Sequence, residues 1–313
     1  MCFLLLIPAA LLAAILLVSY LAYRKAFYHS LRHREEVLEL PQDAQYNEQA
    51  DHMHALIEEM RAVLFERVEI TARDGTRLVG RYIHIRDGAP LQIQFHGYHG
   101  GAVRDFCGGN KLSREAGHNS LVVDQRAHGE SGACTITFGI KERCDCLDWV
   151  NYAVKRFGND TQIILSGVSM GAATVLMATG LELPPQVKGV IADCPYSAPY
   201  DIIRKVCRDI KLPPRLSMPF ISLGARLWGH FRLRDATAAD AVRTSRVPIL
   251  LIHGEDDRFV PCDMSREICR AATEAGVDVR LLTVPRAGHG LSFIEDFKTY
   301  RREVEEFLGR CLK

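Results

Sequence analysis

The chain carries almost no net charge. Its 39 Lys and Arg residues are balanced by 38 Asp and Glu residues, which gives a formal charge of +1 over 313 residues. The basic residues are scattered and do not alternate with aromatic residues, so nothing indicates a nucleic-acid partner. The sequence also lacks internal repeats and low-complexity tracts, and no obligate protein partner is predicted. The 48% share of hydrophobic residues is enough for one large core.

The usual spacings of metal ligands and of nucleotide-binding glycines are missing as well. His52 and His54 lie two residues apart in an expected helix and therefore face different sides, and Cys144 and Cys146 have no second cysteine pair. No Gly-x-Gly-x-x-Gly sequence opens a strand-helix unit. We therefore expect no metal and no other cofactor. The ten cysteines lack the dense spacing of a disulfide scaffold, which indicates mostly free thiols in a reducing compartment.

Charged residues are absent from most of the N-terminal region. Residues 3–23, from Phe3 to Tyr23, are rich in leucine, alanine and isoleucine, and this run is long enough to cross about 30 Å of hydrocarbon. It predicts one transmembrane helix, with a cleaved signal peptide or a buried core helix as alternatives. Met1 and Cys2 supply no positive charge before the run, and residues 19–23 make a poor cleavage site, which disfavours the signal peptide.

Beyond residue 64 the hydrophobic pattern becomes one of strands that alternate with helices. The first two strands, 67–72 and 78–85, flank an Asp-Gly turn and are expected to form an antiparallel hairpin. Six more apolar runs follow, at 91–95, 120–124, 162–165, 187–192, 248–252 and 277–284. This order predicts an α/β fold with a mostly parallel, eight-stranded sheet that is covered by helices on both faces.

One serine between a predicted strand and a predicted helix has glycines around it. Gly167, Ser169 and Gly171 form a Gly-x-Ser-x-Gly sequence after the apolar residues 163–165. A serine on such a sharp turn has a strained backbone, and the glycines let the strand and the helix pass closely. The pattern predicts a nucleophile at a helix N-terminus, where developing negative charge is stabilised. An ordinary glycine-rich turn is the alternative.

An acid and a histidine follow, each just after an expected strand. Asp257 is the predicted acid, with Asp256 as the second choice, and His289 lies between two glycines in an exposed loop. The order serine, acid, histidine is that of the α/β-hydrolases and differs from the orders in the chymotrypsin and subtilisin folds. We therefore expect Ser169 to be the nucleophile, His289 the base and Asp257 the acid that orients it.

Other histidines also lie near expected strand ends. His96, His128 and His253 each precede a glycine, and structural roles are expected for them. His96 and His99 are not followed by the further His and Asp ligands that a binuclear metal site would need. Arg126 is expected to hold loops together through charge-assisted hydrogen bonds.

These motifs together resemble the α/β-hydrolase superfamily, in its serine-aminopeptidase and esterase-like branch with an N-terminal anchor. The resemblance covers about residues 65–311 and rests on the segments 94–97, 124–132, 167–171, 193–197, 253–261 and 288–289. In the family pattern the acid is the fourth residue after the histidine of a His-Gly pair, which here is Asp257.

The resemblance also implies an oxyanion hole and a lid. The two oxyanion donors would be the backbone N–H groups of Met170, which follows the nucleophile, and of Tyr98. The long interval at about 197–246 would form a small helical lid, and its apolar residues would line a pocket together with Tyr98 and Tyr196. A helix that packs on the sheet without substrate contact is the alternative for any of these lid residues.

The expected function is that of a serine hydrolase that cleaves a carboxylic ester through an acyl-enzyme on Ser169. A serine peptidase or aminopeptidase of the same fold is one alternative, and a non-catalytic, membrane-anchored binding protein is another. Residues 196–246 contain no Glu that could hold a substrate amine, which favours the ester. A small-molecule ester, a lipid-like molecule or a peptide is the expected substrate.

We expect three parts along the chain: an anchor at 1–29, a linker and surface helix at 30–64, and a catalytic domain at 65–313. The basic residues that follow the predicted span, Arg24 and Lys25 among them, favour a catalytic domain on the cytoplasmic side of the membrane. The extracellular side is the alternative.

Overall fold

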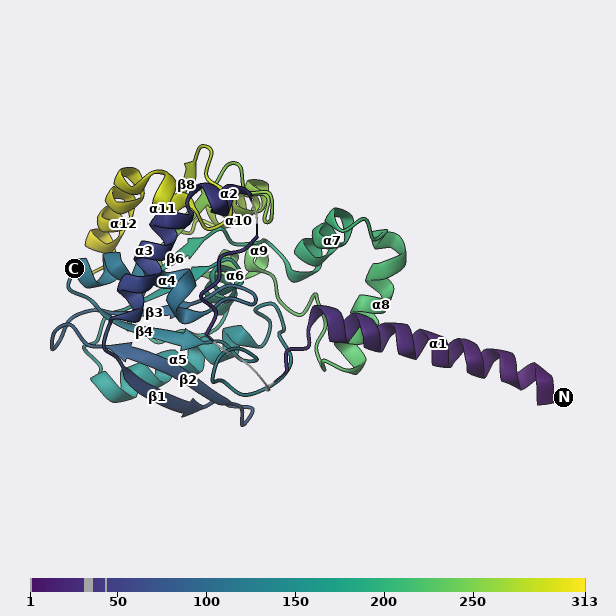
Figure 1. Ribbon diagram of the computed structural model, residues 1–313. Coiled ribbons are helices and arrows are strands. Elements are labelled where there is room, and N and C mark those ends of the chain that lie inside the picture. Colours follow the sequence, from purple (N-terminus) through teal and green to yellow (C-terminus); the bar gives the residue numbers. More distant parts are fainter. Residues whose placement is uncertain (1, 31–35, 43, 313) are drawn as a thin grey trace.

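The computed structural model describes residues 2–30, 36–42 and 44–312 and is built around a central sheet (Figure 1). Within these residues the sheet has eight strands, in the order β1-β2-β4-β3-β5-β6-β7-β8. The strands are β1 (Glu66–Thr71), β2 (Arg77–Ile83), β3 (Leu91–Phe95), β4 (Asn119–Asp124), β5 (Ile163–Val168), β6 (Val187–Asp193), β7 (Ile249–Gly254) and β8 (Val279–Val284). The predicted strands are thus confirmed, with ends that differ by up to three residues.

The pairing of the strands is also as expected. β1 and β2 form the antiparallel hairpin, β2 pairs antiparallel with β4, and all other neighbours are parallel. Because side chains alternate between the faces of a strand, Ile249 and Leu251 of β7 enter one hydrophobic cluster, whereas Leu250 and Ile252 enter the other. The sheet is therefore buried on both faces, as predicted for parallel strands with helical crossovers.

The helices that cover the sheet are divided between these two clusters. One face is covered by α3 (Ala50–Arg61), α4 (Ala102–Glu115), α11 (Ser292–Glu295) and α12 (Phe297–Cys311). The other carries α5 (Glu142–Phe157), α6 (Met170–Ala178) and α10 (Cys262–Glu274). The short helices α2 (Ala44–Glu48) and α9 (Ala238–Ala241), with a 3-10 turn at Val242–Thr244, complete the connections.

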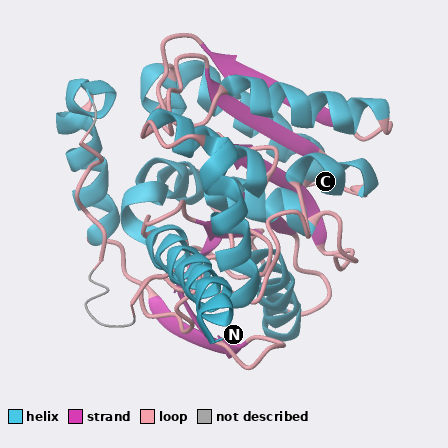
Figure 2. Cartoon of the chain, turned by 90° about the vertical axis from the view of Figure 1, so that its right-hand side faces the viewer, coloured by secondary structure: helices cyan, strands magenta, loops and turns pink. Residues whose placement is uncertain are grey.

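Helix α1 (Cys2–Ala26) projects away from this body (Figure 1) and points toward the viewer in Figure 2. Its residues Ile7–Ala26 have a mean hydropathy of 1.8 and form the one candidate membrane span among the described residues. In the projecting part, Ile7 and Leu11 are 73% and 62% exposed. Farther along, Tyr23 is buried in the main core. The helix therefore has a free apolar part and a part that is packed against the protein.

The packed part of α1 lies along a helical insertion after β6. This insertion contains α7 (Pro199–Asp209) and α8 (Pro214–Leu227), the segment predicted as a lid. Gly224 of α8 faces the α1 backbone so closely that a Cβ atom there would lie 2.4 Å from the carbonyl oxygen of Ser19. The indole N–H of Trp228 donates to the Ser19 hydroxyl at 3.3 Å. The insertion is helical, as expected, and α8 is the part of it that holds α1.

Candidate active site

Ser169 occupies the turn between β5 and α6. Its φ of 55° and ψ of −115° are strained for a residue with a side chain. A Cβ atom on Gly171 would lie 1.8 Å from the carbonyl oxygen of Phe95, and one on Gly167 would lie 2.3 Å from the backbone of Gly171. Only glycine fits at these two positions, so the turn has the geometry predicted from the Gly-x-Ser-x-Gly sequence.

Ser169, His289 and Asp257 are joined by two hydrogen bonds. The Nε2 atom of His289 lies 2.9 Å from the Ser169 hydroxyl, and its Nδ1 atom lies 2.7 Å from Oδ2 of Asp257. Because an ionised carboxylate can only accept, Nδ1 carries the proton and Nε2 accepts from the serine. Asp256, the second choice for the acid, has an exposed side chain. The structure thus brings together the three residues chosen from the sequence.

The loop after β7 holds the Asp257 carboxylate in place. Its Oδ1 atom accepts from the backbone N–H groups of Phe259 and Val260 at 2.8 and 2.7 Å, and His253 Nε2 lies 3.2 Å from Oδ2. Burial opposes ionisation of Asp257, but attraction to His289 and hydrogen bonds from both histidines outweigh it and hold the pKa well below its ordinary value. The carboxylate is therefore ionised at neutral pH and can stabilise an imidazolium.

The two predicted oxyanion donors belong to Met170, the residue after Ser169, and to Tyr98 in the loop after β3. Met170 is the first residue of α6, so its N–H group has no acceptor within the helix. The N–H group of Tyr98 donates to no acceptor in the part of the chain that the structure describes. Asp105 accepts from the N–H of Gly97 at 2.7 Å and so fixes the start of the Tyr98 loop, which passes beside Ser169.

A cavity of about 290 Å³ opens beside Ser169 and His289. Its wall is largely apolar, with contributions from α3, α4, α11 and the segment before α3: Pro41, Tyr46, Met53, Leu56, Phe106, Phe293 and Ile294. None of the lining residues comes from 197–246, and Tyr196 is not among them. The expectation that lid residues line the pocket is therefore wrong for this structure, because α8 packs against α1 instead.

The wall on the side of His289 comes from the chain between α1 and the sheet. The Tyr46 hydroxyl donates to the carbonyl oxygen of His289 at 2.6 Å, and Gln45 Nε2 donates to that of Asp256 at 3.3 Å. No sequence motif indicated that this segment is part of the site. The helical spacing of Met53 and Leu56 predicts a helix with one apolar face, and both side chains are buried on one face of α3.

Asp193, at the end of β6, lines the cavity, as does Asp105 of α4. The carbonyl oxygen of Asp193 accepts from the Ser169 N–H at 2.8 Å. Its side chain is buried, and among the described residues the Oδ1 atom has no hydrogen-bond partner, although Tyr300 donates to the carboxyl group. Burial raises the pKa of Asp193 to about 6, against attraction from His253. The sequence indicated this residue as part of a fold motif but not as a cavity residue.

Cys194 also lies near the Asp257–His289 pair, with potential ligand atoms of the three residues within 4.8 Å of one another. Burial raises the pKa of the Cys194 thiol well above its ordinary value, which keeps it protonated. Asp257 and His289 are already bonded to each other. This group is therefore better suited to proton transfer than to holding a metal. The described cysteines from Cys107 to Cys311 form no disulfide bond with one another.

The α/β-hydrolase class is defined by a mostly parallel sheet of this order and by a serine on a strand-to-helix turn. The serine is hydrogen-bonded to a histidine, which is in turn hydrogen-bonded to an acid. The particular family follows from a comparison with family models. The model of the prolyl oligopeptidase family matches residues 131–313, which is more than half of the chain. The chain belongs to this family and is a hydrolase.

Individual relatives include both peptidases and esterases. The chain is 28% identical over 200 residues to the uncharacterised protein YqkD of Bacillus subtilis. The aligned region covers 63% of this chain and 64% of that protein. It is 26% identical over 275 residues to dipeptidyl aminopeptidase BIII of Pseudoxanthomonas mexicana, with 78% of this chain and 38% of that one covered. The Pyrococcus furiosus esterase Pf2001 has a similar fold, with a TM-score of 0.66, 22% identity, and coverage of 82% and 94%.

Proposed function

We propose that this hydrolase cleaves carboxylic esters through an acyl-enzyme on Ser169. The observation that carries the proposal is the unbroken hydrogen-bonded chain from the serine hydroxyl through His289 to Asp257. This is the arrangement in which a serine hydroxyl, weakly nucleophilic by itself, is activated by an adjacent base.

In the proposed mechanism the Ser169 oxygen attacks the substrate carbonyl while Nε2 of His289 takes the hydroxyl proton. Asp257 stabilises the imidazolium that forms. The N–H groups of Met170 and Tyr98 would bind the oxyanion of the tetrahedral intermediate. His289 then protonates the leaving alkoxide, which departs as an alcohol and leaves the acyl-enzyme. In the second step His289 removes a proton from the water that attacks the acyl-enzyme and releases the carboxylic acid.

The nature of the cavity supports an ester with an apolar acyl group. Met53, Leu56 and Phe293 present apolar surface, whereas Asp105, a charged group in the wall, is already bonded to Arg104 and to a backbone N–H. One observation favours the peptidase alternative: Asp193 lines the cavity, and its buried Oδ1 atom lacks a hydrogen-bond partner among the described residues. It could accept a hydrogen bond from a substrate amine.

We also propose that α1 anchors the protein in a membrane, with the hydrolase on the cytoplasmic side. The exposed apolar residues in the first part of α1 would contact lipid, and exposed Ile210, Leu212 and Leu216 around the α7–α8 turn would extend this surface. Arg24 and Lys25 at the end of α1 support the cytoplasmic orientation. Retention of α1 is favoured over cleavage as a signal peptide because Tyr23 is part of the hydrophobic core.

The test uses full-length protein in detergent, with nitrophenyl esters of increasing acyl length and aminoacyl-anilides as substrates. We expect ester hydrolysis that falls at least about 10⁴-fold in Ser169→Ala, and labelling of the wild type by a fluorophosphonate. Ser222→Ala on α8, outside the cavity, is the matched control. Cleavage of anilides alone would favour the peptidase, and the lack of turnover and labelling would favour a binding protein.

A further inference from the structure

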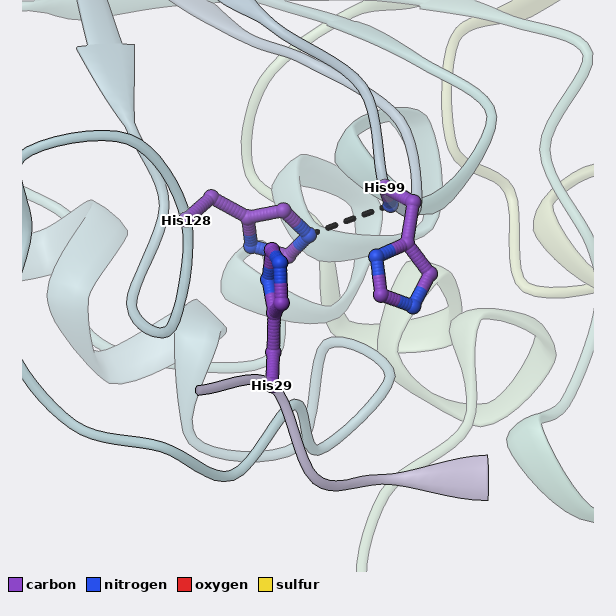
Figure 3. A group of neighbouring side chains, drawn as sticks. All are labelled: His29, His99 and His128. Atoms are coloured by element: carbon purple, nitrogen blue, oxygen red, sulfur yellow. Dashed lines mark hydrogen bonds between the residues drawn. The ribbon is translucent and has the colours of Figure 1, made fainter. Parts of the chain in front are cut away.

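Three histidines from distant parts of the chain lie close together (Figure 3). His29 follows α1, His99 lies in the loop after β3, and His128 lies in the loop after β4. Each offers a ring nitrogen within 4.8 Å of the nitrogens of the other two. The rings of His29 and His99 meet edge to face, with their centroids 4.7 Å apart.

Backbone carbonyl groups set the tautomers of two of these rings. The Nδ1 atom of His29 lies 2.7 Å from the carbonyl oxygen of Ala127, and that of His128 lies 3.0 Å from the carbonyl oxygen of Arg126. Since a carbonyl oxygen only accepts, Nδ1 carries the proton in both rings and the lone pair of the neutral ring is on Nε2. Metal-binding histidines are typically oriented in this way by a second hydrogen bond to a carbonyl or carboxylate.

Neutral imidazole is the form of histidine that ligates a metal ion. The Nε2 atom of His128 accepts one bond, from the backbone N–H of His99 at 3.1 Å (Figure 3). A cation bound to Nε2 of His128 would replace this hydrogen bond from a neutral donor.

There is room for an ion beside the three rings. They border a cavity of about 520 Å³, and the carboxyl groups of Asp124 and Glu130 belong to residues on the same wall. His99 is the exposed member, with a φ of 48°, and its loop contains Gly97, Gly100 and Gly101. A tetrahedral ion with bonds of about 2.1 Å needs ligand nitrogens about 3.4 Å apart. Rotation of the exposed His99 ring toward the other two would provide this closer approach.

We propose that His29, His99 and His128 bind one divalent transition-metal ion of the zinc class, with a fourth position open to water or a carboxylate. Three imidazole ligands suit zinc, and harder ions such as magnesium and calcium prefer oxygen. The ion would join the segment after α1 to the loop that carries Tyr98. The sequence spacing predicted no metal here, because these ligands are brought together only by the fold.

The experiment measures zinc binding directly and is independent of hydrolase activity. Full-length protein without a polyhistidine tag is treated with a chelator, dialysed, and titrated with zinc chloride by calorimetry, and its metal content is then determined by mass spectrometry. We expect one zinc ion per chain and a zinc-dependent rise in melting temperature. His29→Ala and His99→Phe should weaken binding at least about 100-fold.

Two variants separate metal binding from ring packing. His99→Phe keeps an aromatic ring in the cluster but removes its ligand atom, so it should melt like the metal-free wild type and no longer respond to zinc. His84→Ala removes an exposed histidine beside Asp87 and should bind zinc as the wild type does. The proposal is overturned if the wild type binds no zinc at micromolar concentrations, or if His99→Phe binds it as tightly as the wild type.

Discussion

The buried carboxyl group of Asp193 makes the stability of this protein depend on pH in a predictable direction. Burial raises the pKa of Asp193 from 3.8 to about 6 in the folded state. Between pH 4 and 6 the folded state therefore binds more protons than the unfolded state, and the free energy of unfolding contributed by this group falls as the pH rises. At 1.36 kcal/mol for each pKa unit, the loss above pH 6 is about 3 kcal/mol.

Asp193→Asn should remove this loss because asparagine stays neutral and its oxygen can still accept from Tyr300. We expect the variant to be more stable than the wild type by about 2–3 kcal/mol at pH 7.5 and equally stable near pH 4. Urea unfolding of the full-length protein in detergent, followed at several pH values, measures the difference. Asp160→Asn at an exposed position is the control and should change stability little at any pH.

A stability difference that stays constant from pH 4 to pH 8 would refute this reasoning, because burial of a carboxyl group lowers the free energy of unfolding only when the group is ionised. The same variant also tests the second candidate function. If Asp193 accepts a hydrogen bond from a substrate amine, Asp193→Asn should raise KM for aminoacyl-anilides and leave KM for esters unchanged. An equal effect on both substrate classes would count against that role.

Three further changes test the geometry of the fold and the site. Asp257→Asn should lower kcat for ester hydrolysis about 10⁴-fold while the protein still folds, because the imidazole loses its orienting carboxylate; steady-state kinetics and circular dichroism measure both. Arg126→Met should destabilise the protein by about 3–5 kcal/mol in urea unfolding, because it leaves Asp145, now bonded to Arg126 at 2.5 and 2.6 Å, as a buried charge without its partner. Gly171→Ala should prevent accumulation of soluble, labelled protein, since its Cβ would overlap a carbonyl oxygen of β3, whereas Gly309→Ala, with open space around it, should behave as the wild type.

The strands and the bonded residues at the turn were predictable because they leave local signals. Buried parallel strands appear as short apolar runs, and the order of serine, acid and histidine along the chain is specific to one arrangement. The choice of Asp257 over Asp256 came from the family pattern. Its physical reason is visible only in the fold, where the backbone N–H groups of Phe259 and Val260 bind the Asp257 carboxylate.

The cavity wall and the histidine cluster could not be predicted from local patterns. The spacing of Met53 and Leu56 indicates a helix with one apolar face, but it does not say which surface that face covers. His29, His99 and His128 have no spacing that is typical of metal ligands, since two loops at neighbouring strand ends and the end of α1 bring them together. The packing of α1 against α8 could not be predicted either, because a uniformly apolar helix gives no indication of which of its sides will contact the protein.

The junction between α1 and the body determines how a soluble form of this hydrolase should be designed. A cut just before Ser30 would remove Phe27, which is 1% exposed and packs against Phe138 and Phe231 with ring centroids 5.9 and 5.2 Å away. Loss of such a ring typically costs about 3–5 kcal/mol and would uncover aromatic surface. A shortened protein that begins at Ser19, with polar residues in place of exposed Leu21, would keep the core intact and still lose most of the membrane-crossing length.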